Sequence, residues 1–311
     1  MRKIIITTGV LVLAVLGIWY FFVRSYDYVV TFSVPTNSPS LYYRILESEQ
    51  LQKNTDKSTA VLKLSGPNSQ LIKSSPFNEI NQQLLLNEES YILNWRFNND
   101  QDQTRVKLGI KSVDHSKFNR FQYLLGRSGY KAAFGKKAKG LISDLKEYYA
   151  SFRLDNSTVN PKIAKTYYIS QSLSSSIPQK AGKMMESVLG ITKYLSDNDF
   201  TIDSNPFSII DEIDIKKNSI DFRFCFPVSP KDLQKIRSQN RYSIDSLEVN
   251  EFESAKYFGN YATTNEAWYS MLGSNPVETI NNNYFIETYL NNPHEGGDDT
   301  QWEALIYMIK K

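Results

Sequence analysis

The chain has 311 residues, of which 13% are aromatic and 22% charged, and it contains 14 glycines and 11 prolines. This composition is sufficient for two globular domains with their own cores, and it excludes a chain that is disordered along most of its length. Basic residues number 36 against 33 acidic residues, and Arg2, Lys3 and Arg24 flank an apolar N-terminal segment. Without these three the charges cancel, which argues against a nucleic acid partner because a phosphate backbone needs a basic surface.

The N-terminal residues 4–23 are uncharged and consist mainly of Ile, Val, Leu, Ala and Phe. This length matches the roughly 20 residues that a helix needs to cross a bilayer. We predict a single-pass anchor at residues 1–25; the alternative is a cleaved signal peptide, although no small-x-small cleavage site is present. Arg2 and Lys3 favour a cytoplasmic N-terminus, which predicts a cell-membrane protein with extracytoplasmic domains, while Arg24 weakens that orientation.

Strand and helix signals alternate after this segment. Tyr28 to Pro35 is rich in β-branched and aromatic residues, and Ser38-Pro39-Ser40 is typical of a helix start. Apolar residues recur at helical spacing in the later part of residues 129–152. Further strands, separated by turns rich in Gly, Pro and Asn, are predicted at residues 60–64, 79–86, 91–97 and 104–113.

This order of elements over residues 26–154 resembles the START or polyketide-cyclase-like (SRPBCC) helix-grip superfamily. The resemblance implies a curved antiparallel sheet that a long helix closes over an apolar cavity. No sequence motif accompanies it, and residues 51–59 are polar, so no site residue is carried over. We expect Trp95 and the aromatic residues around it to belong to the core.

No motif indicates a cofactor or a metal. Residues 129–137 have five residues between their glycines and a lysine where a phosphate-binding loop needs Ser or Thr. Residues 294–299 contain His, Glu and two Asp, in no order typical of a coordination loop. Cys225 is the single cysteine, which excludes an intrachain disulfide and a thiolate metal cluster, and we expect an inert thiol.

A polar segment at residues 155–162 is predicted to be a linker between two domains. The second domain, residues 163–311, begins with a strand and continues with an amphipathic helix. A strand that ends in Pro227-Val228 follows, then a short helix that carries Trp268. Two further strands close the chain.

Side-chain alternation in these last two strands places carboxylates among aromatic rings. Phe285, Glu287 and Tyr289 share one face, because successive side chains of a strand point to opposite faces. Glu303 likewise shares a face with Leu305 and other apolar residues of the terminal strand. A carboxylate among rings is costly unless it is paired or protonated, so both Glu residues are candidate ligand-binding groups. The alternative is that either one lies in water at a strand end.

The residues Gly259, Tyr261 and Trp268, followed by the spacing Glu287-x-Tyr289-x-Asn291-x-Pro293, resemble the GyrI-like effector-binding domain. The resemblance covers residues 163–309. It implies a SOUL-like domain in which a cupped antiparallel sheet holds a small apolar or cationic ligand over acidic side chains, with Tyr261 and Trp268 at the rim. The DNA-binding head that precedes such domains in some MerR-type and AraC-type regulators is not seen in this sequence.

The sequence therefore predicts an α+β protein with a transmembrane helix, a helix-grip-like domain and a GyrI-like domain, each built on an antiparallel sheet. We expect it to bind a small apolar or cationic molecule without binding DNA, through Glu287, Tyr289, Phe285, Trp268, Tyr261 and Glu303. An enzymatic role stays open, since a hydrolase of strained electrophilic rings would use the same pocket glutamate. A structural or protein-binding module, recognisable by a filled pocket, is the third alternative.

Overall fold

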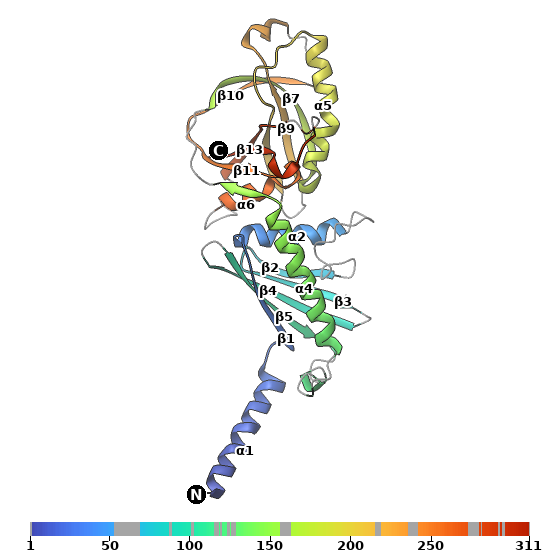
Figure 1. The fold of residues 1–311 in the computed structure, drawn as a ribbon, viewed down its shortest axis with the longest axis vertical. Coiled ribbons are helices and arrows are strands. Elements are labelled where there is room, and N and C mark those ends of the chain that lie inside the picture. Colours follow the sequence, from blue (N-terminus) through green and yellow to red (C-terminus); the bar gives the residue numbers. More distant parts are fainter. Residues whose placement is uncertain are drawn as a thin grey trace. The chain divides into compact units, whose positions relative to one another are not determined.

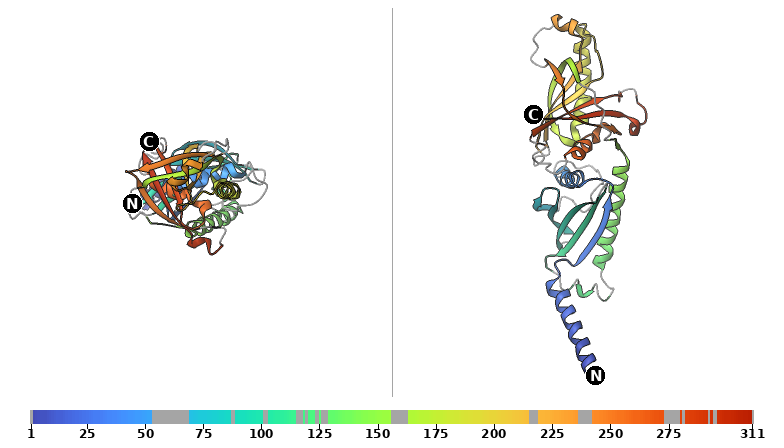
Figure 2. Two further views of the ribbon diagram at one scale, coloured as in Figure 1. Left: turned by 90° about the horizontal axis from the view of Figure 1, so that it is seen from above. Right: turned by 90° about the vertical axis from the view of Figure 1, so that its left-hand side faces the viewer.

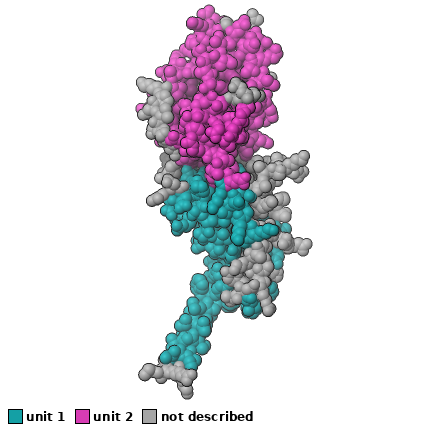
Figure 3. All heavy atoms as spheres, viewed as in Figure 1, with its two compact units in different colours: residues 1–146 teal, residues 147–311 magenta. Residues whose placement is uncertain are grey.

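The computed structural model describes residues 2–52, 69–86, 89–100, 103–114, 118, 120–122, 125, 129–155, 163–214, 219–235, 242–272, 280, 282–291, 293 and 296–310. The chain divides into two compact units, residues 1–146 and 147–311 (Figure 3). Both contain an antiparallel sheet and helices, so the fold is α+β. The predicted strand at 60–64 and residues 156–162 of the predicted linker lie outside the described residues.

The first unit begins with an apolar helix. Helix α1 (Arg2–Ile18) continues into a π-helical turn, η1 (Trp19–Val23). Residues Ile5–Val23 are long and apolar enough to cross a membrane, and none of this span is buried in the protein. A signal sequence has the same properties, so the structure establishes an exposed apolar helix and leaves its topology as a prediction.

A five-stranded antiparallel sheet forms the body of the first unit in the described part of the chain, with strand order β1-β5-β4-β3-β2. Helices α2 (Ser38–Gln52) and α4 (Gly129–Ala150) accompany the sheet, and α4 runs along it in Figure 1. The strands are β1 (Tyr28–Val34), β2 (Ser69–Ser75), β3 (Glu79–Leu86), β4 (Glu89–Asp100) and β5 (Gln103–Ser112).

Alternating apolar residues of this sheet form the core of the first unit. Trp95 is fully buried, as expected, and its indole nitrogen donates to Gln82 Oε1 at 2.6 Å. The ring of Tyr91 contacts Phe134 of α4 with 4.9 Å between centroids, so α4 covers the same face of the sheet. The helix-grip resemblance implies a sheet face covered by one long helix, and the contact between Tyr91 and Phe134 is of that kind. The helix-grip superfamily itself stays a prediction.

The second unit contains a curled antiparallel sheet with strand order β10-β7-β9-β8-β12-β13-β11-β6 among its described residues (Figures 1 and 2). Its helices are α5 (Lys180–Asp197) and α6 (Asn265–Met271), with short helical turns η2 (Ile177–Gln179), η3 (Pro230–Lys235), η4 (Tyr261–Thr263) and η6 (Asp299–Gln301). The strands are β6 (Arg153–Asp155), β7 (Ile163–Ser176), β8 (Phe207–Asp214), β9 (Ser219–Pro227), β10 (Ser243–Val249), β11 (Glu253–Phe258), β12 (Asn283–Tyr289) and β13 (Glu303–Lys310).

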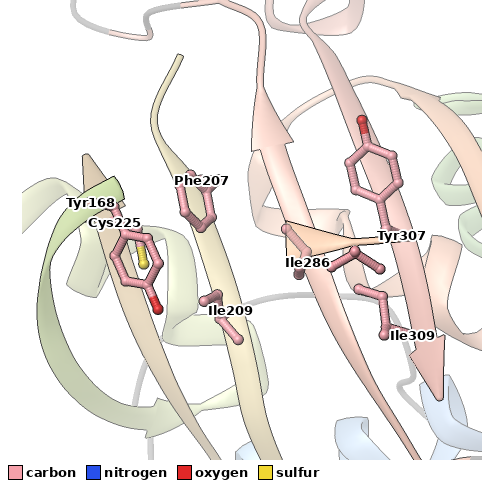
Figure 4. Packing of buried hydrophobic residues seen from close by; sticks show 8 residues of the cluster. Tyr168, Phe207, Ile209, Cys225, Ile286, Tyr307 and Ile309 are labelled. Atoms are coloured by element: carbon pink, nitrogen blue, oxygen red, sulfur yellow. The ribbon is translucent and has the colours of Figure 1, made fainter. Parts of the chain in front are cut away.

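The central strands of this sheet carry buried residues on both faces. One face carries an apolar cluster from neighbouring strands (Figure 4): Tyr168, Phe207, Ile209, Cys225, Val249, Ile286, Tyr307 and Ile309. The opposite face carries Phe285, Glu287 and Tyr289, and its partners come from α5 and α6, as Met184 and Trp268 show. Because strands alternate their side chains, the registers of β8, β12 and β13 decide which residues join Glu287.

Several elements are longer than the sequence predicts. β7 continues through the serine cluster to Ser176, because pairing with β9 continues to Ser219. β8 fills the segment before Asp214, where the sequence shows no clear alternation. β4 extends to Asp100 through the predicted turn at Asn98 and Asn99, since β5 pairs with it over that whole length. In each case pairing with a neighbouring strand offsets a weak local preference.

Candidate functional site

The site is built around a carboxylate that is completely removed from water. Glu287 lies in the middle of β12 and is 0% exposed, while Phe285 and Tyr289 on the same face are 0% and 3% exposed. Ser208 of β8 and Ile306 of β13 lie directly beside Glu287 in the sheet. An isolated carboxylate in such surroundings is unstable, so its partners define the site.

Lys180, the first residue of α5, supplies the countercharge. Its ammonium contacts both carboxylate oxygens of Glu287 and donates to Thr264 Oγ1 at 2.6 Å. The Lys180 and Glu287 side chains are 3% and 0% exposed, which makes this a fully buried ion pair. Thr264 in turn donates to the carbonyl of Tyr261 at 3.1 Å, so the ammonium also rests on the turn that leads into α6.

Tyr289 completes the hydrogen bonding of the carboxylate. Its hydroxyl donates to Glu287, lies 3.0 Å from Ser208 Oγ and 3.4 Å from the sulfur of Met184. Glu287 thus accepts from a cation with both oxygens and from a neutral hydroxyl with one of them. Charge-assisted hydrogen bonds of this kind are stronger than neutral ones.

Aromatic rings form the wall beside the ammonium. The Lys180 Nζ atom lies 4.6 Å from the ring centroid of Trp268. The Trp268 ring is in turn stacked on Phe285, with 5.6 Å between centroids and 25° between planes. A cation over an indole face is attracted by the ring quadrupole. The site therefore surrounds a positive charge with a carboxylate, a hydroxyl and an indole.

The electrostatics follow from burial. Loss of hydration lowers the pKa of the Lys180 ammonium, and the Glu287 carboxylate acts in the opposite direction. Burial raises the pKa of Tyr289 well above its usual value, and the negative charge of Glu287 raises it further. Tyr289 is therefore a neutral hydrogen-bond donor at physiological pH.

Two buried polar atoms on this side of the sheet lack a hydrogen-bond partner within the described residues: Trp268 Nε1 and Gln171 Oε1. Gln171 pairs with Phe224 across β7 and β9, Phe224 with Ser208 across β9 and β8, and Ser208 with Glu287 across β8 and β12. One transverse row of the sheet thus leads from Gln171 to Glu287. Most buried polar groups in folded proteins are satisfied, so Trp268 Nε1, whose ring contacts the buried ammonium, is a candidate ligand contact, whereas Gln171 lies three strands away from Glu287.

The predicted site residues do not all meet. Four of them lie together: Phe285, Glu287, Tyr289 and Trp268. The prediction that Trp268 lies at the rim of the cup is wrong, because its side chain is fully buried. Tyr261 packs its ring 4.9 Å from that of Tyr289, and its hydroxyl donates to the Glu303 carbonyl at 2.8 Å and accepts from the Asn291 amide at 3.0 Å. The Tyr261 hydroxyl therefore connects the backbone at Asn291 with the backbone at Glu303.

Glu303 lies apart from this group. It belongs to the opposite face of β13, and its half-buried carboxylate pairs with Lys256 at 2.7 Å. Its neighbours across β12 are on the face that includes Ile286. Glu303 is therefore not a second acidic residue of the site around Glu287.

Lys180 is the residue of this site that sequence reasoning missed. The helix signal covers residues 184–195, and a lysine just before it is ordinarily read as a solvated residue. The position of Pro178 shortly before it was the available signal for a helix starting at 180.

Cys225 is buried and its thiol pKa is raised by burial, as an inert thiol requires. No cluster of metal-ligating side chains is found in the part of the chain that the structure describes.

No protein-family model matches the chain, and no curated protein does. Among solved structures, the C-terminal domain of EcmrR is 12% identical, with a TM-score of 0.40 and coverage of 51% of this chain and 96% of that domain. A hydrolase encoded by lin2189 from Listeria innocua is 10% identical, with a TM-score of 0.29 and coverage of 53% and 96%. SAV2435 bound to tetraphenylphosphonium is 9% identical, with a TM-score of 0.30 and coverage of 51% and 93%. These similarities are loose, and what the site can do rests on its own contacts.

Proposed function

We propose that the second unit is a GyrI-like module that binds a small cationic or apolar molecule at Glu287, in place of the Lys180 side chain that fills the site in this structure. The observation that carries the proposal is the fully buried carboxylate with a cation held against it and against the face of Trp268. These groups are complementary to an organic cation, which needs a negative partner and ring faces. The unpartnered Trp268 Nε1 adds a hydrogen-bond donor for a polar atom of the ligand.

In this proposal Lys180 occupies the position of the ligand's charge until a ligand arrives. Exchange of one cation for another keeps Glu287 paired throughout, so the large cost of an unpaired buried carboxylate is avoided. Lys180 is the first residue of α5, and its long side chain can carry the ammonium to water without unfolding the helix. The ligand then gains the contacts with Trp268 and Phe285.

A hydrolase remains the second candidate class, because Glu287 and Tyr289 form a hydrogen-bonded acid and phenol pair. A general base needs a lone pair directed at a water molecule. Here both carboxylate oxygens accept from Lys180, and one of them also accepts from Tyr289. These contacts favour binding over general-base chemistry at this residue.

For the rest of the chain, we propose a single-pass anchor at Ile5–Val23 that holds both units at the outer surface of the cell membrane. No residue of this apolar span is buried in the protein, and apolar surface exposed to water is costly. With the N-terminal segment set aside, the net charge is close to zero, which supports a role that does not involve direct DNA binding. Residues 26–154 and 163–311 are proposed to be two domains with a linker at 155–162, the first of them helix-grip-like. The division between the compact units falls earlier, at residues 146 and 147, because β6 (Arg153–Asp155) pairs with β11 of the second sheet.

The proposed binding site is tested with a matched pair of probes. Tetraphenylphosphonium and tetraphenylborate have the same shape and opposite charge, and isothermal titration calorimetry measures the Kd of each for the purified full chain. Glu287→Gln is expected to weaken tetraphenylphosphonium binding by at least about tenfold, since about 1.4 kcal/mol is one decade. Lys180→Met is expected to tighten it by a similar factor, because the competing internal cation is gone.

The opposite signs of these two effects separate the proposal from a general loss of structure. Lys183→Met, an exposed lysine one turn further along α5, is the matched control and should leave both affinities unchanged. Equal affinities for both probes in all four proteins would refute a charge-selective site at Glu287. Tight binding of the borate by the wild-type protein would assign the site to anions instead.

A further inference from the structure

One buried arginine ties the end of the apolar helix into the first unit. Arg120 donates from Nε to Asp27 at 2.7 Å, and from one terminal nitrogen to the carbonyl oxygens of Tyr20 and Phe21 at 3.0 and 3.1 Å. The Arg120 and Asp27 side chains are 4% and 1% exposed. The last carbonyl groups of a helix have no partner within the helix, and a cation at that end also meets the negative end of the helix dipole.

Asp27 is held in turn by β5, since its second oxygen accepts from the Ser112 amide at 2.9 Å. The helix end, Arg120 and the end of β5 therefore form one connected network. Removal of the helix by cleavage would take two acceptors from a buried guanidinium. The fold of the first unit thus includes the end of the apolar helix.

The segment that carries Arg120 has an apolar side that faces away from this network. Phe118, Phe121 and Leu125 are 59%, 53% and 53% exposed, whereas Arg120 is 3% exposed. Phe118 and residues 120–122 are helical, and the Leu125 amide donates to the Phe121 carbonyl at 3.2 Å. Spacings of three and four residues place the apolar side chains on one side of a helical segment.

We propose that Phe118, Phe121 and Leu125 form a membrane-contacting surface that enters the lipid interface beside the exit of Ile5–Val23. The inference rests on the anchor in the proposed function, because the contacts of Arg120 fix this surface next to Tyr20 and Phe21. Trp19 and Phe22 of the helix end are also more than half exposed, at 53% and 69%. Aromatic side chains favour the interface between hydrocarbon and water, and an amphipathic segment lies in the same zone.

The test uses the full chain with Cys225→Ala, so that one introduced cysteine carries an environment-sensitive nitrobenzoxadiazole label. Phe121→Cys places the label on the proposed surface. Arg105→Cys is the matched control, because Arg105 is exposed on β5 and lies seven residues before Ser112, roughly 23 Å from the helix exit. Both proteins are reconstituted in vesicles of phosphatidylcholine and phosphatidylglycerol that contain lipids with a nitroxide near the headgroup.

The label at position 121 is expected to lose at least half of its emission to the nitroxide lipids, while the label at position 105 loses little. Equal quenching at both positions, or none at position 121 in protein that floats with the vesicles, would overturn the surface and leave the anchor intact. Shielded emission at position 121 without quenching would indicate a protein partner and would also overturn it. Protein that fails to float with vesicles would refute the anchor itself, and the surface with it, whereas binding of cationic probes at Glu287 is independent of either result.

Discussion

Replacing Lys180 by methionine tests the central claim that a buried ion pair organises the second unit. Methionine keeps much of the length and apolar volume of the lysine stem but removes the ammonium. The lost contacts are those with both oxygens of Glu287, the 2.6 Å hydrogen bond to Thr264 and the 4.6 Å contact with the Trp268 ring. Glu287 then keeps the hydroxyl of Tyr289 as its one described donor, at a position that is 0% exposed.

The expected destabilisation is about 3 to 5 kcal/mol, because removing one partner of a buried pair leaves the other charge uncompensated. For a unit of this size, that loss lowers Tm by roughly 6 to 20 °C. The double variant Lys180→Met/Glu287→Gln should recover most of the loss, since both charges are then absent and Gln can still accept from Tyr289. Lys183→Met is the matched control, since its side chain is 43% exposed and pairs with Glu186 at the surface, where such pairs contribute about 0 to 1 kcal/mol.

Urea denaturation measures these differences, with hydrogen exchange of the β12 amides as the readout for the second unit. If Lys180→Met lowers the free energy of unfolding no more than Lys183→Met does, the claim that an unpaired Glu287 destabilises the second unit is refuted. A double variant less stable than Lys180→Met would show that packing and not charge decides the effect. Partial restoration of Lys180→Met by millimolar tetraphenylphosphonium, and not by tetraphenylborate, would connect the stability result to the proposed function.

Three further outcomes are expected. The folded-state pKa of Tyr289 is raised above its usual value, so its contribution to the free energy of unfolding is complete below pH 10 and is lost above it, by about 1.4 kcal/mol per pH unit. Tyr289→Phe should flatten this alkaline loss in urea titrations. The lowered pKa of Lys180 gives the opposite trend below pH 10.5, where stability rises with pH. Gly259→Ala should destabilise the second unit by at least about 1 kcal/mol in thermal unfolding, because φ is +145° and a Cβ would lie 2.7 Å from the Tyr257 hydroxyl. Gly140→Ala in α4 is the control, since its Cβ meets no atom within 4 Å and should not destabilise the protein. Cys225 should resist iodoacetamide at pH 8 until the protein is unfolded, since burial raises its pKa, and rapid alkylation of the native protein would contradict its placement.

The amino-acid sequence by itself determined the parts of this protein that depend on local periodicity. Alternation in β12 placed Glu287 on one face with Phe285 and Tyr289, and the structure has all three there. Runs of β-branched and aromatic residues located β1, β3, β4, β5 and β9, and helical spacing located α4 and α5. The uncharged N-terminal run predicted an apolar helix, because no long-range contact is needed to form one.

Tertiary structure alone decided what surrounds Glu287. Lys180 is 107 residues away in the sequence, and a lysine before an amphipathic helix carries no signal that it will be buried. Strand registers brought Ser208 beside Glu287, and the fold of α6 brought Trp268 over Phe285. The same registers placed Glu303 on the other face, where it pairs with Lys256. Local patterns fix the direction of a side chain, but the partner that neutralises a buried charge is chosen by packing between distant segments, and here that partner is Lys180.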